Sequence, residues 1–375
     1  MKQLSFFIHY SRKYAKPIVC LAISLWALFL RFQRYGGRPL WNDELYQLQF
    51  MTGPFQPFWE RRIYGDFTYF PGDYLLCYPF LRLSGLSQIT QSFPKLIGID
   101  KWMLALPHIL VTIVGFFLLY RVCERHMKTL GAYALTFFIV CYNSNLIFHS
   151  FEFRPYAVLP ILSLASFYLS EMVVVRFGQL RFAKKFFLGI FFIFVILFHL
   201  YGILIASLCI LYFLIIHRST LPKKELARII GFFACVYLAV LPAWLWYASA
   251  RPISLPEFNT FQYISHPLMD TVGFLKSIVG NLVGFKKFYI FLLGFAAWFF
   301  IPGSERKKQI FFFLLLIVLP VELIFVADLL KNYMFLQRQF IWVMPLFAIL
   351  VGWMWDSLIV RLGEQLKPSG QSKRF

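Results

Sequence analysis

The sequence predicts an all-α polytopic membrane protein, and three observations support this fold class. Of its 375 residues, 60% are hydrophobic and only 14% are charged, unlike a soluble domain of this length. Apolar stretches of roughly 20 residues, enough to cross a bilayer core about 30 Å thick, recur from residue 17 to 361. The 47 phenylalanines show no alternation of polar and apolar residues, which favours helices over a β-barrel.

The first predicted span follows a basic N-terminal stretch that superficially resembles a signal peptide. No small-residue cleavage site follows the apolar run, so we expect a retained first helix. The apolar run 186–217 is too long for one comfortable helix, and "FHLYG" at 198–202 predicts two short helices that meet there. About ten spans are expected, at 14–32, 102–120, 129–148, 155–175, 186–198, 200–217, 229–248, 288–302, 310–328 and 340–360.

Charge in the connecting segments predicts the orientation in the membrane. One set of short segments holds more than half of the 37 lysines and arginines, which marks it as cytoplasmic by the positive-inside rule. Most of the 17 acidic residues face the other side, together with the long loops 33–101 and 249–287. The chain is thus expected in the cytoplasmic membrane, with both termini cytoplasmic and any active site periplasmic or extracellular. The basic segments are 1–16, 121–128, 176–185, 218–228, 303–308 and 361–375.

The predicted organisation is one transmembrane domain, 1–360, followed by a basic cytoplasmic tail, 361–375. Within the domain, the first outer loop, 33–101, is expected to carry juxtamembrane helices. The net charge of +20 does not indicate nucleic acid, because the basic residues are scattered in short loops rather than gathered on one face. The six cysteines show no CxxC spacing and are expected to be inert.

The acid pair Asp43–Glu44 in "RPLWNDELYQL" is the first candidate for chemistry. Trp41, Leu45 and Leu48 lie at i, i+4 and i+7, which predicts a short helix on the membrane surface that begins at this pair. A helix N-terminus favours an ionised carboxylate, as a proton-accepting base or a cation ligand requires. The alternative is that both acids only cap the helix.

A second polar group occurs in "FHSFEFRPYAVLPIL", with His149, Glu152, Arg154 and Tyr156 around Pro155. Proline suits the first turn of a helix, so a span should begin here with Glu152 just outside it. The alternative is an Arg–Glu pair that anchors a helix end among the headgroups, with Tyr156 in the interfacial aromatic belt.

Two further groups lie at predicted outward turns. His199 and Tyr201 flank the break in "FHLYG", and Lys331 and Arg338 lie at the mouth of the last span. A lone interfacial histidine is more often a hydrogen-bonded residue than a ligand. Arg338 either snorkels to the interface or holds two oxygens of a phosphate.

Charge counting places all four groups on the same membrane face. Together they combine carboxylates that accept protons, arginines that hold an anion, and an aromatic body that accommodates a lipid tail. A divalent cation, Mg²⁺ or Mn²⁺, is a possible cofactor with Asp43, Glu152 and His149 as ligands. The spacing specifies no such cage, and arginine can neutralise a phosphate instead.

These motifs, in this order, resemble the glycosyltransferase C superfamily, in its branch of protein O-mannosyltransferases and aminoarabinose transferases. "LWNDELYQL" is similar to its first-loop Asp-Glu motif, "TYFPGDYLLCYPFLRLSG" to its proline-tyrosine segment, and "FHSFEFRPYAVLPIL" to its acid-x-Arg-Pro-Tyr helix entrance. "FHLYGILI" and "RQFIWVMP" are weaker matches. Two departures are "FPGDYLL", where relatives have two prolines before a Leu-Tyr-Tyr-like run, and Arg338–Gln339, where the family commonly has Arg-Tyr.

The resemblance implies inverting transfer of a sugar from a polyprenyl-phosphate donor to a hydroxyl of a lipid, glycan or protein acceptor. It implies Asp43 as the general base, with Glu44 and Glu152 orienting hydroxyls. Donor and sugar binding would fall to Tyr69, Arg154, Tyr156, His199, Tyr201, Lys331 and Arg338. The competing class is a flippase or transporter of lipid-linked sugars, although no strong internal repeat is present. An intramembrane metallohydrolase ranks lower, because no HExxH motif occurs.

Overall fold

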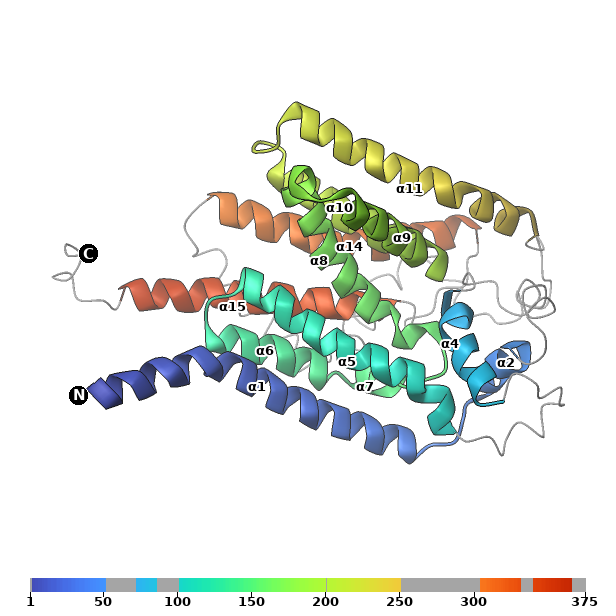
Figure 1. Cartoon of the computed structure of the whole chain (residues 1–375), viewed down its shortest axis with the longest axis horizontal. Coiled ribbons are helices and arrows are strands. Elements are labelled where there is room, and N and C mark those ends of the chain that lie inside the picture. The colour runs from blue at the N-terminus through green and yellow to red at the C-terminus, as the bar shows by residue number, and fades with distance from the viewer. Residues whose placement is uncertain are drawn as a thin grey trace.

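The computed structural model describes residues 2–51, 72–85, 101–199, 201–250, 304–331 and 340–365, and these ranges contain helices and no β-strand. This agrees with the predicted all-α class. The long helices lie side by side as an elongated bundle (Figure 1). The described α-helices and 3-10 helices (η), long and short, are α1 (Lys2–Gly36), α2 (Asn42–Met51), α4 (Gly72–Leu83), α5 (Lys101–His126), α6 (Leu130–Cys141), α7 (Ser144–His149), η3 (Pro155–Ala157), α8 (Leu159–Arg176), η4 (Phe177–Gln179), α9 (Phe182–Phe198), α10 (Gly202–His217), α11 (Lys223–Ala250), α14 (Ser304–Lys331) and α15 (Val343–Gln365).

Helix length and composition support a membrane-embedded protein. Besides the helices long enough to cross a membrane, two shorter apolar helices are present among the described residues, Leu130–Cys141 and Gly202–His217. A total of ten spans stays a prediction, and the span expected at 288–302 lies outside the described residues. Among the described residues, five segments are long and apolar enough to cross a membrane: Tyr14–Gly36, Lys101–His126, Leu159–Gln179, Lys223–Leu245 and Val343–Glu364.

The expected single span 129–148 is wrong, because the chain forms two helices there. α6 ends at Cys141 and α7 begins at Ser144. Between them, Asn143 has extended backbone angles and its side chain accepts a hydrogen bond from Leu146 N at 2.9 Å. Asparagine is among the preferred N-cap residues, so it ends one helix by starting the next.

The predicted break at "FHLYG" is confirmed. α9 ends at Phe198 and α10 begins at Gly202, whose backbone N–H donates to the carbonyl of His199 at 2.7 Å. A Cβ at Gly202 would lie 1.9 Å from the Val195 carbonyl oxygen, so only glycine allows this close approach. The sharp turn brings His199 and Tyr201 to the junction of two helices.

The first-loop helices α2 and α4 lie at one end of the bundle (Figure 1). The N-terminal end of α1 and the C-terminal end of α15 lie at the other end, on the same side as each other. A separate apolar cluster joins α2, α4 and α5 around Leu48, Tyr74 and Leu104, and it includes Phe153. This cluster fixes the two short helices against the segment that precedes α8.

Asp356 of α15 secures the start of α6. It is buried, and its carboxylate accepts hydrogen bonds from Lys128 N at 2.9 Å, Thr129 N at 2.7 Å and Thr129 Oγ1 at 2.8 Å. A carboxylate at a helix N-terminus satisfies orphan N–H groups and complements the helix dipole.

Asp356→Ala is therefore expected to destabilise the protein by about 1–3 kcal/mol, because three hydrogen bonds from part-buried donors of Lys128 and Thr129, each worth about 0.5–1.5 kcal/mol, lose their acceptor. Thermal unfolding in detergent measures this as a lower midpoint. Asp356→Asn retains one oxygen acceptor and should lose less. Equal stability of all three proteins would contradict the capping role.

Candidate functional site

Glu44 lies in the first turn of α2 and is completely buried. Oε2 accepts hydrogen bonds from Arg38 Nη1 at 2.6 Å and from Trp41 N at 2.9 Å. Oε1 accepts one from Phe153 N at 2.9 Å and a longer one from Arg38 Nη2 at 3.3 Å. Both oxygens of Glu44 thus hold α2 to the loop before it and to the distant segment before α8.

Asp43 lies beside Glu44 and is only partly buried. Its carbonyl oxygen lies 3.5 Å from Arg154 Nη1, the donor of a long hydrogen bond. α2 begins at Asn42, as the sequence predicts, and this places the acid pair directly against the 149–157 segment. The first two sequence-predicted groups, over 100 residues apart in the chain, are therefore neighbours.

The 149–157 segment is a buried turn between α7 and α8. Pro155 opens the short helix η3, and α8 follows from Leu159, close to the predicted helix start. Glu152 is completely buried and its Oε2 makes a short contact with His149 Nδ1. The backbone N–H of Arg154 donates to the Glu152 carbonyl at 2.7 Å, which tightens the turn.

Tyr156 connects this turn to the α9–α10 junction. Its ring is buried, with its centroid 6.2 Å from that of His149 and 6.2 Å from that of His199. The Arg154 guanidinium carbon lies 5.8 Å from the Tyr156 ring centroid, within cation–π range. Tyr156 thus contacts three other sequence-predicted residues, His149, Arg154 and His199.

His199 is completely buried, and Nδ1 accepts a hydrogen bond from Tyr201 N at 3.1 Å. Burial, with a smaller contribution from the charge of Arg154, lowers the pKa of His199 to about 3. Its imidazole is therefore neutral at physiological pH. The Tyr201 ring stacks on Phe340 just before α15, with centroids 5.5 Å apart.

The remaining predicted residues cannot be placed in this site. Lys331 is the last residue of α14 and its side chain lies outside the described part, as do Tyr69 and Arg338. The set considered for a divalent cation does not assemble in the described structure. His149 and Glu152 touch, but Asp43 does not bring a carboxylate oxygen close enough to complete a three-ligand group.

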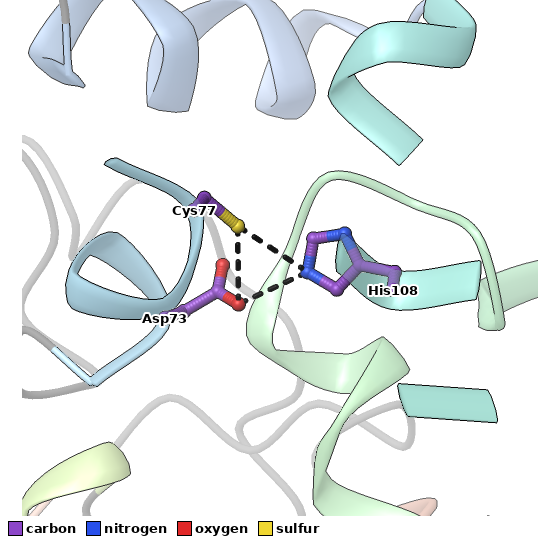
Figure 2. A group of neighbouring side chains, drawn as sticks. All are labelled: Asp73, Cys77 and His108. Carbon is purple, nitrogen blue, oxygen red and sulfur yellow. Dashed lines mark hydrogen bonds and ion pairs between the residues drawn. The ribbon is translucent and has the colours of Figure 1, made fainter. Parts of the chain in front are cut away.

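A different group of metal-ligand side chains, Asp73, Cys77 and His108, lies where α4 meets α5 (Figure 2). All three are completely buried. Asp73 and Cys77 lie one turn apart on α4, and His108 comes from the neighbouring α5. The i, i+4 spacing was the available sequence signal, since it places both residues on one helix face. Nothing in the sequence paired that face with His108.

This cluster connects with the candidate site through two contacts. Gln47 of α2 donates to Asp73 Oδ2 at 2.5 Å. The His108 ring lies edge-on to Phe153, with centroids 6.0 Å apart, and the backbone of Phe153 holds Glu44. Gly72 allows α4 to approach α9, because a Cβ there would lie 2.3 Å from Phe198 Cα.

Arg31 is a further buried charge that sequence reasoning missed. It lies within the first span, and Nη1 donates to the carbonyls of Ala27 and Cys141, each at 3.1 Å. A longer bond joins Nη2 to the Val140 carbonyl at 3.4 Å. Because cations stabilise helix C-termini, Arg31 is explained as a clamp between α1 and the end of α6.

Comparison of the chain with protein-family models, with curated proteins and with solved structures found no match. The chemistry of the site must therefore be inferred from its residues. A partly exposed carboxylate, a nearby guanidinium, aromatic rings and the neutral imidazole of His199 meet at one end of an apolar bundle. Such a set can accept a proton, hold an anion and bind a hydroxylated ring.

Proposed function

We propose that the protein is a membrane glycosyltransferase of the glycosyltransferase C type. It would move a sugar from a polyprenyl-phosphate donor to a hydroxyl acceptor on the outer side of the cytoplasmic membrane. The observation that carries the proposal is the contact of the acid pair Asp43–Glu44 with the 149–157 segment. Glu44 accepts from Phe153 N, and Arg154 reaches the Asp43 carbonyl. Two of the motifs that suggested the family are thus adjacent in space as well as ordered in sequence.

In the proposed reaction, Asp43 acts as the general base. Its carboxylate accepts the proton of the acceptor hydroxyl while that oxygen attacks the anomeric carbon. The bond from this carbon to the phosphate oxygen breaks, and the polyprenyl phosphate leaves with the electron pair. Attack from the face opposite the phosphate inverts the configuration. A well-placed base contributes on the order of 10²–10⁴-fold to the rate.

The other residues would position the reactants. Both oxygens of Glu44 already accept hydrogen bonds, which favours a role in holding α2 rather than in contacting sugar. Glu152 and neutral His199 suit the binding of sugar hydroxyls. Arg154 lies close to Asp43, with Nη1 at 3.5 Å from the Asp43 carbonyl oxygen, and its guanidinium suits stabilisation of the leaving phosphate.

Arg338 remains the second proposed phosphate ligand, and Arg338→Ala is expected to weaken donor binding. Loss of a charge-assisted contact to phosphate costs about 1.5–3 kcal/mol, or roughly 10- to 150-fold in Kd. Titration of the detergent-solubilised protein with a polyprenyl-phosphate sugar measures it. Lys308→Ala, on a predicted cytoplasmic segment, serves as the control. An unchanged Kd in Arg338→Ala would remove this residue from phosphate binding.

A liposome assay tests the proposed function itself. Purified protein is reconstituted with a polyprenyl-phosphate sugar and a hydroxyl acceptor, and the lipid products are identified by mass spectrometry. Release of free polyprenyl phosphate that depends on the acceptor supports the transferase. Movement of intact donor between leaflets without bond cleavage would instead support the transporter, which is expected to place its polar site near the bilayer midplane.

A further inference from the structure

The geometry of Asp73, Cys77 and His108 resembles three of the four ligands of a tetrahedral metal site. Asp73 Oδ1 lies 3.0 Å from His108 Nε2, and Cys77 Sγ lies 3.7 Å from the same nitrogen. Cys77 Sγ and Asp73 Oδ1 are 4.0 Å apart. Bonds of about 2.0–2.3 Å at tetrahedral angles place zinc ligands roughly 3.3–3.6 Å apart, so small side-chain shifts bring all three atoms to one ion.

The three atoms also face one another, as Figure 2 shows. The other carboxylate oxygen of Asp73 is held by Gln47, which fixes the direction of the carboxylate. Outer hydrogen bonds of this kind orient the ligands of metal sites. Nδ1 of His108 is buried and has no hydrogen-bond partner among the described residues, which leaves Nε2 as its directed contact.

The charge balance of the cluster favours a divalent cation. Asp73 is completely buried, and its one ion-pair partner among the described residues is His108. Burying a carboxylate is costly unless a positive charge accompanies it. A carboxylate and a thiolate together neutralise a doubly charged ion, and imidazole adds a neutral ligand.

The donor set indicates which ion fits. Magnesium and manganese prefer oxygen ligands, whereas a sulfur, a nitrogen and an oxygen suit zinc. We propose that Asp73, Cys77 and His108 bind one zinc ion, with a fourth ligand supplied by water or a further group. Binding displaces the thiol proton of Cys77, which passes to solvent.

The position of the site indicates a structural role. The ion would tie α4 to α5, and through Gln47 it would steady α2. His108 also lies against Phe153, whose backbone holds Glu44. Zinc would thus fix α4 and, through Gln47, the helix α2 that carries Asp43, without contacting the reactants. This inference is independent of the proposed transferase reaction.

Metal analysis of the full-length protein in detergent tests the proposal. Inductively coupled plasma mass spectrometry should find about one zinc per chain after extensive desalting. Cys77→Ser and Asp73→Asn are expected to weaken zinc binding by more than about 100-fold, since even outer-shell substitutions cost 10- to 100-fold. Cys209→Ser, at another completely buried cysteine on α10, is the matched control and should retain zinc.

Cobalt titration keeps the test decisive if a variant fails to fold. Protein stripped with chelator is titrated with Co²⁺, and a thiolate-to-cobalt charge-transfer band is expected in the parent protein and in Cys209→Ser. The band should be absent from Cys77→Ser. Absence of both stoichiometric zinc and this band in the parent protein would overturn the proposal and leave an Asp73–His108 hydrogen bond. Retention of either signal by Cys77→Ser would overturn it equally.

Discussion

Asp43→Asn should reduce sugar transfer by about 10²–10⁴-fold and leave the protein folded in the membrane. The substitution preserves the size of the side chain and removes its capacity to accept a proton. It also preserves the backbone carbonyl that lies near Arg154. Because Asp43 is partly exposed, exchange of its carboxylate for an amide should cost little stability.

The measurement separates the chemical step from binding. Donor affinity is determined by titration, and transfer by release of polyprenyl phosphate under single-turnover conditions. We expect an unchanged Kd for the donor and a much slower release in Asp43→Asn. A loss confined to the rate identifies an interaction made in the transition state.

Glu124→Gln is the matched control for removal of one acidic charge. Glu124 is 43% exposed and pairs with Arg121 near the C-terminal end of α5, far along the helix from His108. Its loss should leave transfer unchanged. Full activity of Asp43→Asn would exclude Asp43 as the base, and an equal loss in both variants would indicate a general effect of charge.

Local helix signals predicted much of the candidate site. Asn42 and Asp43 start α2, and "FHLYG" interrupts the long apolar run where the structure ends α9 and begins α10. Pro155 opens the helical entrance to α8. Each of these features depends on backbone geometry within a few residues, which a single sequence carries.

Contacts between distant segments were not predictable in the same way. The pairing of Glu44 with Phe153 N depends on how α2 rests against the turn, and no periodicity encodes it. Asp73 and His108 come from different helices whose faces meet only in the folded bundle. Likewise, Asn143 interrupts an apolar segment because its side chain caps α7, an effect that hydropathy alone does not register.

Glu44→Ala is expected to produce the largest loss of stability, about 3–5 kcal/mol. Arg38 and Glu44 form a 2.6 Å ion pair whose side chains are 8% and 0% exposed. Removal of the carboxylate leaves a buried guanidinium without its partner and leaves Phe153 N without an acceptor. An uncompensated buried charge of this kind costs far more than a surface pair gains.

The exposed pair Arg228–Glu225 on α11 supplies the control. Its side chains are 51% and 23% exposed, and its N–O distance is 2.6 Å. The pair therefore has the same distance as Arg38–Glu44 but is less buried. Glu225→Ala should cost less than about 1 kcal/mol. Denaturant unfolding of both variants in the same detergent measures the difference, and equal losses would contradict the role assigned to burial.

A double-mutant cycle distinguishes pairing from packing at Glu44. Arg38→Leu combined with Glu44→Leu removes both charges, so it should be more stable than Glu44→Leu alone, although Phe153 N stays unsatisfied. If Glu44 serves to position α2, the folded double variant should transfer sugar slowly, because α2 no longer holds Asp43 against the 149–157 segment. Normal transfer by a folded double variant would show that Asp43 needs no support from the pair.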